Sequence, residues 1–174
     1  MSRKLLKNTL LIINFIIFLA SCSSLKEDIN YNKNNILDKI KAVDDNYFIF
    51  EQLLYVDIES QTLIHLEKGE ILSIYPISSS FYGTGSKKNS LKTPLGRHEI
   101  FKKLGGDLPI NAILKGRVWT GAIADVIKEP IDTDFDHVTS RILWLDGLEL
   151  GKNRGNNIDS RERYIYIHGT AEEG

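Results

Sequence analysis

The chain has 174 residues, of which 42% are hydrophobic and 26% charged, and its formal net charge is −1. This near balance excludes the dense positive field that dominant nucleic-acid binding requires, so we expect no nucleic-acid partner. About 150 residues remain after the N-terminal segment described next, which is enough for one domain with a hydrophobic core but not for two.

Residues 1–21 have the layout of a secretory signal peptide. Arg3, Lys4 and Lys7 precede an apolar run from Leu10 to Ala20, and a charged start followed by a short apolar stretch is what the export machinery recognises. A bilayer-spanning helix needs about 20 apolar residues, so a permanent transmembrane anchor is the less favoured alternative. Removal of this segment takes away three cations and no acids, and the net charge changes from −1 to −4.

The apolar run ends in Leu19-Ala20-Ser21-Cys22, which resembles a bacterial lipobox, where the cysteine becomes the lipidated first residue of the mature protein. Cys22 is the only cysteine of the chain, so no internal disulfide can form. We predict a lipid anchor on Cys22 that holds an exported protein at the membrane, facing the periplasm or the cell wall. The alternative is a free thiol behind an ordinary cleaved signal.

Two segments are expected between the lipid anchor and the folded domain. Residues 22–34 are polar and rich in asparagine, a composition that buries too little apolar surface to order itself and predicts a flexible tether. Apolar residues then recur at helical spacing, which predicts one amphipathic helix within residues 35–51. They are Ile36, Leu37, Ile40 and Val43.

From residue 52 the pattern is that of β-strands. Apolar residues alternate with polar ones over 54–58, and turns at 59–61 and 68–70 separate this run from the apolar runs 63–66 and 71–75, which predicts a three-stranded meander. Later strand-like runs are 97–101, 117–120, 141–145 and 163–168. We therefore predict a mainly β fold, a sandwich or an open barrel, with one or two helices at its margin.

Two motifs fall short of known ligand sites. The alternating carboxylates of residues 132–136 resemble a calcium loop, but His137 stands where glycine is needed and Leu143 where a bidentate glutamate should be. A solvated acidic turn is the better interpretation. The stretch Gly83–Ser90 lacks the Gly-Lys-Ser/Thr ending of a phosphate loop, so its glycines are predicted to serve turns with positive φ. We expect no metal and no cofactor.

His168 is the strongest catalytic candidate among the four histidines. It ends the strand-like run 163–168, and the period of two places it on one face with Tyr164 and Tyr166. Histidine is suited to general-base chemistry because its unperturbed pKa lies near neutrality, although an exposed strand end without function is the alternative. The other three lie in a hairpin strand, a strand start and a polar turn and are expected to be structural or exposed: His65, His98 and His137.

Two segments resemble the catalytic domain of the L,D-transpeptidases, the YkuD-like and ErfK-like cell-wall enzymes. They are Tyr-Ile-Tyr-Ile-His-Gly-Thr at 164–170 and Ser90–Ile100 with its Thr-Pro-Leu-Gly loop. The resemblance covers residues 52–174 and implies a β-rich domain that acts on peptidoglycan stem peptides. In that family a cysteine thiolate attacks a diaminopimelate carbonyl, D-alanine leaves, and a second amine accepts the acyl group.

The resemblance assigns the role of base to His168, and Gly169 and Thr170 match the same motif and are expected to orient the imidazole. Family members place Ser/Thr-His-Gly-Cys shortly afterwards, whereas no cysteine follows His168 here. Because Cys22 lies in the lipobox, we do not expect it to substitute.

We accordingly expect a truncated domain that lacks the nucleophile and the closing C-terminal strands, with an open sheet edge that favours aggregation. The alternative is a lipid-anchored protein that contacts peptidoglycan without catalysis. Candidates to line a substrate groove are Tyr82, Trp119 and Trp144, with core packing as their alternative role. Arg141 is a candidate to bind a stem-peptide carboxylate, on its charge alone.

Overall fold

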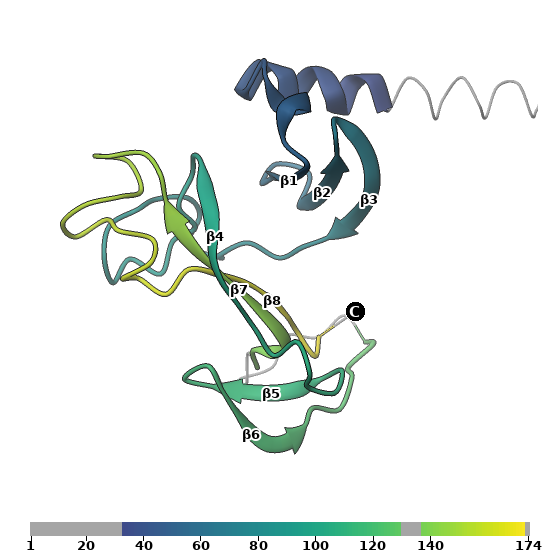
Figure 1. The fold of residues 1–174 in the computed structure, drawn as a ribbon. Coiled ribbons are helices and arrows are strands. Elements are labelled where there is room, and N and C mark those ends of the chain that lie inside the picture. Colours follow the sequence, from purple (N-terminus) through teal and green to yellow (C-terminus); the bar gives the residue numbers. More distant parts are fainter. Residues whose placement is uncertain (1–32, 130–136, 173–174) are drawn as a thin grey trace, which may run out of the picture. The chain divides into compact units, whose positions relative to one another are not determined.

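The computed structural model describes residues 33–129 and 137–172 (Figure 1). These residues form two compact units, one that ends at Ser78 and one that begins at Ser79. The boundary falls inside the segment 52–174 that the sequence assigns to a single catalytic domain. The predicted signal peptide, Cys22 and the acidic run 132–136 lie outside the described residues.

The first unit combines a helix with a three-stranded antiparallel sheet. Residues 33–43 are helical, including the last two residues of the predicted tether. The strands β1 (Gln52–Asp57), β2 (Thr62–Glu67) and β3 (Glu70–Pro76) follow in the order β1-β2-β3, after a short 3-10 helix η1 (Tyr47–Ile49). The predicted helix and meander are therefore confirmed. No helix in the described part of the chain is long and apolar enough to cross a membrane.

The core of the first unit is small. Ile64 and Leu66 lie two residues apart on β2, share one face of the sheet and pack with Ile40 of the helix. Ile36 and Leu37, one turn earlier, are partly buried against this cluster. Val43, the last of the four apolar residues at helical spacing, is 63% exposed, so the buried stripe of the helix ends at Ile40.

The second unit is a five-stranded antiparallel sheet built around β7 (Thr139–Gly147). On one side of β7 lies β4 (His98–Leu104), and on the other side β8 (Tyr166–Gly169). A hairpin of β5 (Ala112–Lys115) and β6 (Val118–Ile123) joins β7 through the pair Ile113 and Thr139. The prediction of a mainly β fold is confirmed, and two antiparallel sheets are the elements that the predicted sandwich class requires.

Strand boundaries differ from the sequence pattern at two instructive places. Arg117, predicted as the first residue of a strand, lies in the two-residue turn between β5 and β6, where both Gly116 and Arg117 have positive φ, 57° and 70°. Tyr164 has φ 59°, and this left-handed residue delays the start of β8 to Tyr166. Local backbone geometry, which the apolar pattern does not encode, moves both boundaries.

Candidate active site

His168 lies on β8 in the second unit, with its side chain exposed. Its partner across the sheet is Ile142 of β7, and the neighbouring pair is Tyr166 with Trp144. Because these pairs follow one another without a bulge, the imidazole and the Tyr166 ring lie on the same face of the sheet, roughly 6.6 Å apart along the strand. The predicted sharing of a face by these two residues is thus present in the structure.

A backbone carbonyl defines the protonation pattern of the His168 ring. Nδ1 lies 2.9 Å from the carbonyl oxygen of Gly169, and because a carbonyl only accepts, Nδ1 carries the hydrogen in the neutral ring. Nε2 then presents its lone pair and has no hydrogen-bond partner among the described residues. An exposed, unprotonated nitrogen of this kind is suited to remove a proton from a substrate or a nucleophile.

The two residues after His168 make different contacts. Gly169 passes so close to β7 that a Cβ atom there would stand 3.0 Å from both the carbonyl oxygen and the hydroxyl of Thr139, so a larger residue would push β8 away. The hydroxyl of Thr170 accepts a hydrogen bond of 3.1 Å from the backbone N–H of Glu172 and none from the imidazole. The orienting contact to the ring therefore comes from the Gly169 carbonyl.

An aromatic cluster with two arginines, Arg117 and Arg161, lies on the sheet that carries His168. The Trp144 ring is 5.3, 5.7 and 5.9 Å from the rings of Phe101, Tyr164 and Tyr166. The Arg117 guanidinium lies 4.8 Å from the centres of the Trp144 and Tyr164 rings and donates a hydrogen bond of 3.0 Å to the Tyr166 hydroxyl. The left-handed turn residue thus reaches the strand that carries His168.

Arg117 also lines a pocket of about 350 Å³, which we call the Arg117 pocket. Its walls come from the end of β4, the loop behind it and the β5–β6 hairpin. Its lining side chains include Leu104, Asp107, Leu114, Arg117 and Trp119. Of the three aromatic groove candidates, Trp119 lines this pocket and Trp144 stacks on its arginine, whereas Tyr82 is 59% exposed and stands against Phe81.

The Thr-Pro-Leu-Gly loop is tied to the segment before β8 by one fully buried side chain. The amide of Asn153 donates to the carbonyls of Leu95 and Arg97 at 3.1 and 2.9 Å, and its oxygen accepts from the Glu149 N–H at 2.9 Å. Asn153 is 0% exposed, so all its polar atoms are satisfied inside the protein. Asn153 therefore links the Thr-Pro-Leu-Gly loop to the segment that begins at Glu149.

The family model of YkuD, described as the L,D-transpeptidase catalytic domain, matches residues 51–174. The chain belongs to the L,D-transpeptidase catalytic-domain family. No curated protein and no solved structure gives a significant match. The matched residues include the three strands of the first unit and all of the second, and the family acts on peptidoglycan stem peptides.

His98 takes a structural place in this L,D-transpeptidase domain. Its Nδ1 donates to the Gly96 carbonyl at 2.9 Å, and its Nε2 accepts from the hydroxyl of the buried Ser160 at 2.8 Å. Burial lowers the pKa of His98 below its usual value, against the opposing effects of the Gly96 carbonyl, Glu149 and Asp146. The neutral ring therefore serves as a clamp between β4 and the 149–160 segment.

Two of the remaining sequence candidates make contacts of other kinds. His65 hydrogen-bonds to Gln52 within the first unit, and Arg141 donates to its neighbour, the Ser140 carbonyl, at 2.7 Å. Gly83, with φ 77°, donates to the Ser80 carbonyl at 2.9 Å, which confirms its predicted use in a turn. Gly85, with φ 156°, instead donates to the Thr93 carbonyl beside the Thr84–Thr93 bridge, outside a turn. Among residues 33–129 and 137–172, no group of three or more acidic, histidine or cysteine residues could hold a metal ion.

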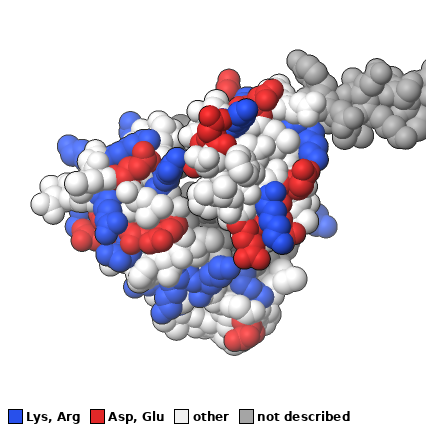
Figure 2. All heavy atoms as spheres, turned by 45° about the horizontal axis from the view of Figure 1, so that its top comes forward, with Lys and Arg blue, Asp and Glu red and all other residues white. Residues whose placement is uncertain are grey.

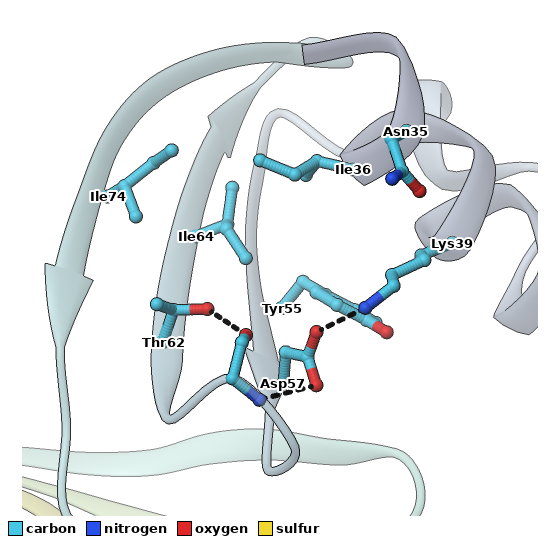
Figure 3. Close-up of a pocket in the computed structure, with 9 residues that line it drawn as sticks. Asn35, Ile36, Lys39, Tyr55, Asp57, Thr62, Ile64 and Ile74 are labelled. Carbon is cyan, nitrogen blue, oxygen red and sulfur yellow. Dashed lines mark hydrogen bonds and ion pairs between the residues drawn. The ribbon is translucent and has the colours of Figure 1, made fainter. Parts of the chain in front are cut away.

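The first unit of the domain has a pocket of its own, about 240 Å³, between its helix and its sheet (Figure 3). Lys39 extends from the helix to Asp57 at the end of β1, and the two form an ion pair of 3.0 Å. This ion pair lowers the pKa of Asp57, chiefly through the hydrogen bond from Lys39. The cation of this pocket is therefore already neutralised by a carboxylate.

Charge is mixed on the surface. Figure 2 shows lysine and arginine side chains interspersed with aspartate and glutamate over the visible face.

Sequence reasoning missed Arg117 and Asn153, the two residues that organise the site. The Lys115-Gly116-Arg117-Val118 stretch carried a usable signal, because glycine followed by one residue between apolar runs is a two-residue hairpin pattern. Asn153 carried none, since asparagine-rich segments are usually exposed loops.

Proposed function

We propose that this protein is a peptidoglycan L,D-transpeptidase, with His168 as the general base of acyl transfer on the exposed face of β8. The observation that carries the proposal is the imidazole itself, which stands in the family's His-Gly-Thr segment with Nε2 unprotonated and unpartnered among the described residues. The Arg117 pocket on the same unit offers the neighbouring space for a peptide.

In this mechanism His168 first removes a proton and then returns it. Nε2 removes the proton of a thiol, the thiolate adds to the stem-peptide carbonyl, and the imidazolium returns the proton to the amine of the departing D-alanine. An acceptor amine then attacks the thioester, and Nε2 takes up its proton. The Gly169 carbonyl stabilises the imidazolium formed in each cycle, because it accepts the hydrogen bond from Nδ1. Cys22 is the only cysteine among the 174 residues, so the thiol of this scheme does not come from residues 23–174.

A second candidate function takes account of Cys22 being the only cysteine among the 174 residues. With Cys22 reserved for a lipid, the chain acts as a lipid-anchored protein that binds peptidoglycan without catalysis. The two candidates differ in muropeptide composition: a transpeptidase changes the crosslinks of the cell wall, and a binding protein cosediments with peptidoglycan and leaves them unchanged.

The test of catalysis is muropeptide analysis of cells that express the protein from its own gene. General-base catalysis contributes about 100-fold or more, so His168→Ala is expected to abolish the additional crosslinks, while His65→Gln, in the first unit, leaves them intact. Equal crosslinking by wild type and His168→Ala would remove His168 from the mechanism. Unchanged crosslinks in a strain that lacks the protein would favour the binding function.

We further propose that a lipid on Cys22 anchors the protein at the membrane, facing the periplasm or the cell wall. The support is the Leu-Ala-Ser-Cys segment behind a short apolar run. Metabolic labelling with a fatty acid is expected to mark the wild-type protein and not Cys22→Ala. Labelling of both proteins would contradict the assignment of the anchor.

A further inference from the structure

We infer that Arg117 binds the free carboxylate at the end of a stem peptide, whose small apolar side chain occupies the Arg117 pocket. The inference deepens the proposed function and rests on it, since it names the residue that recognises the peptide end. Three observations on the second unit carry it: the charge of Arg117, which has no acidic partner among the described residues, its position in the turn, and the composition of the pocket.

Among residues 33–129 and 137–172, Arg117 has no carboxylate partner. Its contacts there are the hydroxyls of Tyr166 and Tyr164 and the rings of Trp144 and Tyr164. Arg161 and Lys39, by contrast, pair with Asp146 and Asp57 at 3.2 and 3.0 Å. A guanidinium carries five N–H donors in a planar fork, so most of the donors of Arg117 remain free for an anion.

The backbone of Arg117 argues against a role in turn formation alone. A two-residue hairpin turn with positive φ at both positions is normally built from Asn-Gly, Asp-Gly or Gly-Gly. Arg117 at φ 70° accepts the left-handed conformation, which costs a residue with a Cβ on the order of 1 kcal/mol. Its side chain is then held in place by two aromatic rings and the hydroxyls of Tyr166 and Tyr164, an arrangement that fixes the fork before any ligand arrives.

The pocket beside the fork suits a small apolar group. Leu104, Leu114 and Trp119 contribute apolar walls around about 350 Å³, which lies at the small end of ligand-pocket volumes. Asp107 lines the same pocket without pairing with Arg117, so a ligand with several negative charges would be repelled. One carboxylate attached to a small apolar body, such as the terminal D-alanine of a tetrapeptide, satisfies both constraints.

The same arginine connects the pocket to the base. Arg117 donates to Tyr166, and Tyr166 stands two residues from His168 on one face of β8. A peptide whose terminal carboxylate lies on Arg117 therefore carries its last peptide bonds toward the imidazole. Arg117 is accordingly a specificity-determining residue that selects free peptide ends and sets the position of the chain along β8.

The experiment is calorimetric titration of the full-length protein with a stem tetrapeptide that ends in free D-alanine, and with the same peptide ending in a carboxamide. A charged hydrogen-bond pair contributes about 1.5–3 kcal/mol, so the wild type is expected to bind the free acid at least about 10-fold more tightly than the amide. Arg117→Asn should reduce this preference to less than about 2-fold, and Arg117→Lys should retain only part of it. Asparagine suits the left-handed turn, so the Asn variant is expected to fold, as circular dichroism will show.

Arg154→Asn is the matched control, because Arg154 is exposed and no described side-chain contact involves it; the preference for the acid should be unchanged there. Equal binding of acid and amide by the wild type, or a preference that survives in Arg117→Asn, would overturn the inference and leave the proposed function standing. If the wild type binds neither peptide, the proposed function fails and the inference falls with it.

Discussion

At the scale of single residues, two polar side chains connect the segments around the site, the buried Asn153 and the half-buried His98. Asn153 links the Thr-Pro-Leu-Gly loop to the segment before β8, and His98 links the first residue of β4 to Ser160. Interactions of this kind are decided by the partner that folding brings into reach, so neither was predictable from residue type. The role predicted for His98, structural rather than catalytic, agrees with its hydrogen bonds.

Asn153→Ala should destabilise the protein strongly. The substitution removes three hydrogen bonds at a site that is 0% exposed, and each contributes about 1 kcal/mol. We expect the free energy of unfolding, measured by urea titration, to fall by about 3 kcal/mol. Asn156→Ala, at an exposed position of the same segment, is expected to change it by less than about 0.5 kcal/mol. A similar small effect of both variants would contradict the linking role of Asn153.

Stability should also fall in mild acid because of His98. Burial lowers the pKa of the folded-state imidazole, so the unfolded state, with a pKa of about 6.5, takes up a proton more readily. The contribution of the neutral His98 ring to the free energy of unfolding is present above a pH of about 6.5 and is lost as the pH falls below it. Comparison of urea unfolding at pH 7.5 and 5.5 should show a larger loss for the wild type than for His98→Gln, which does not titrate. An equal loss of unfolding free energy in the wild type and in His98→Gln would contradict the link between protonation of His98 and stability.

At the scale of elements, the strands follow the alternation of apolar residues and their ends follow backbone geometry. The meander β1-β2-β3 was predictable from the sequence because each strand has an apolar face and lies between clear turn residues. β5 was not, since its four residues are too few to establish a period. The positive φ of Arg117 and Tyr164 moved the starts of β6 and β8; Gly116 before Arg117 indicates the first of these turns, whereas nothing in the composition around Tyr164 indicates the second.

The end of β4 provides a test with its own internal control. Gly105 has φ 83°, and a Cβ there would stand 2.8 Å from the Ser140 carbonyl oxygen, while Gly106 has open space around it. Gly105→Ala is therefore expected to lower the free energy of unfolding by about 1–3 kcal/mol. Gly106→Ala should be neutral within about 0.5 kcal/mol, because it meets no steric barrier. Thermal melting of both variants, in the same buffer, checks the difference.

At the scale of the whole molecule, the family match extends over both compact units although each has its own sheet. The catalytic candidate, its aromatic neighbours and the Arg117 pocket all belong to the second unit. Sequence reasoning identified the family and the strand with His168, because both depend on residues that are contiguous in the chain. The division at residue 78 could not be predicted, since no run of glycine, proline or charge marks a linker there.

The first unit should not be stable by itself. Its core cluster consists of Ile40, Ile64 and Leu66, and Leu63 is buried besides; a chain of that size buries too small a fraction of its surface to fold firmly alone. A peptide comprising residues 33–78 is expected to show little helical or strand signal in circular dichroism and no cooperative melting. A sharp thermal transition of the isolated peptide would contradict this expectation.

The hydrogen bonds that hold the Thr-Pro-Leu-Gly loop have a consequence for the order of folding. They join residues that are 78, 58 and 52 positions apart in the chain, from Arg163 to Gly85, from Asn153 to Leu95 and from Arg97 to Glu149. Contacts between such distant residues require the closure of large loops and slow the search for the native state. The part of the second unit around this loop is thus expected to form late in folding.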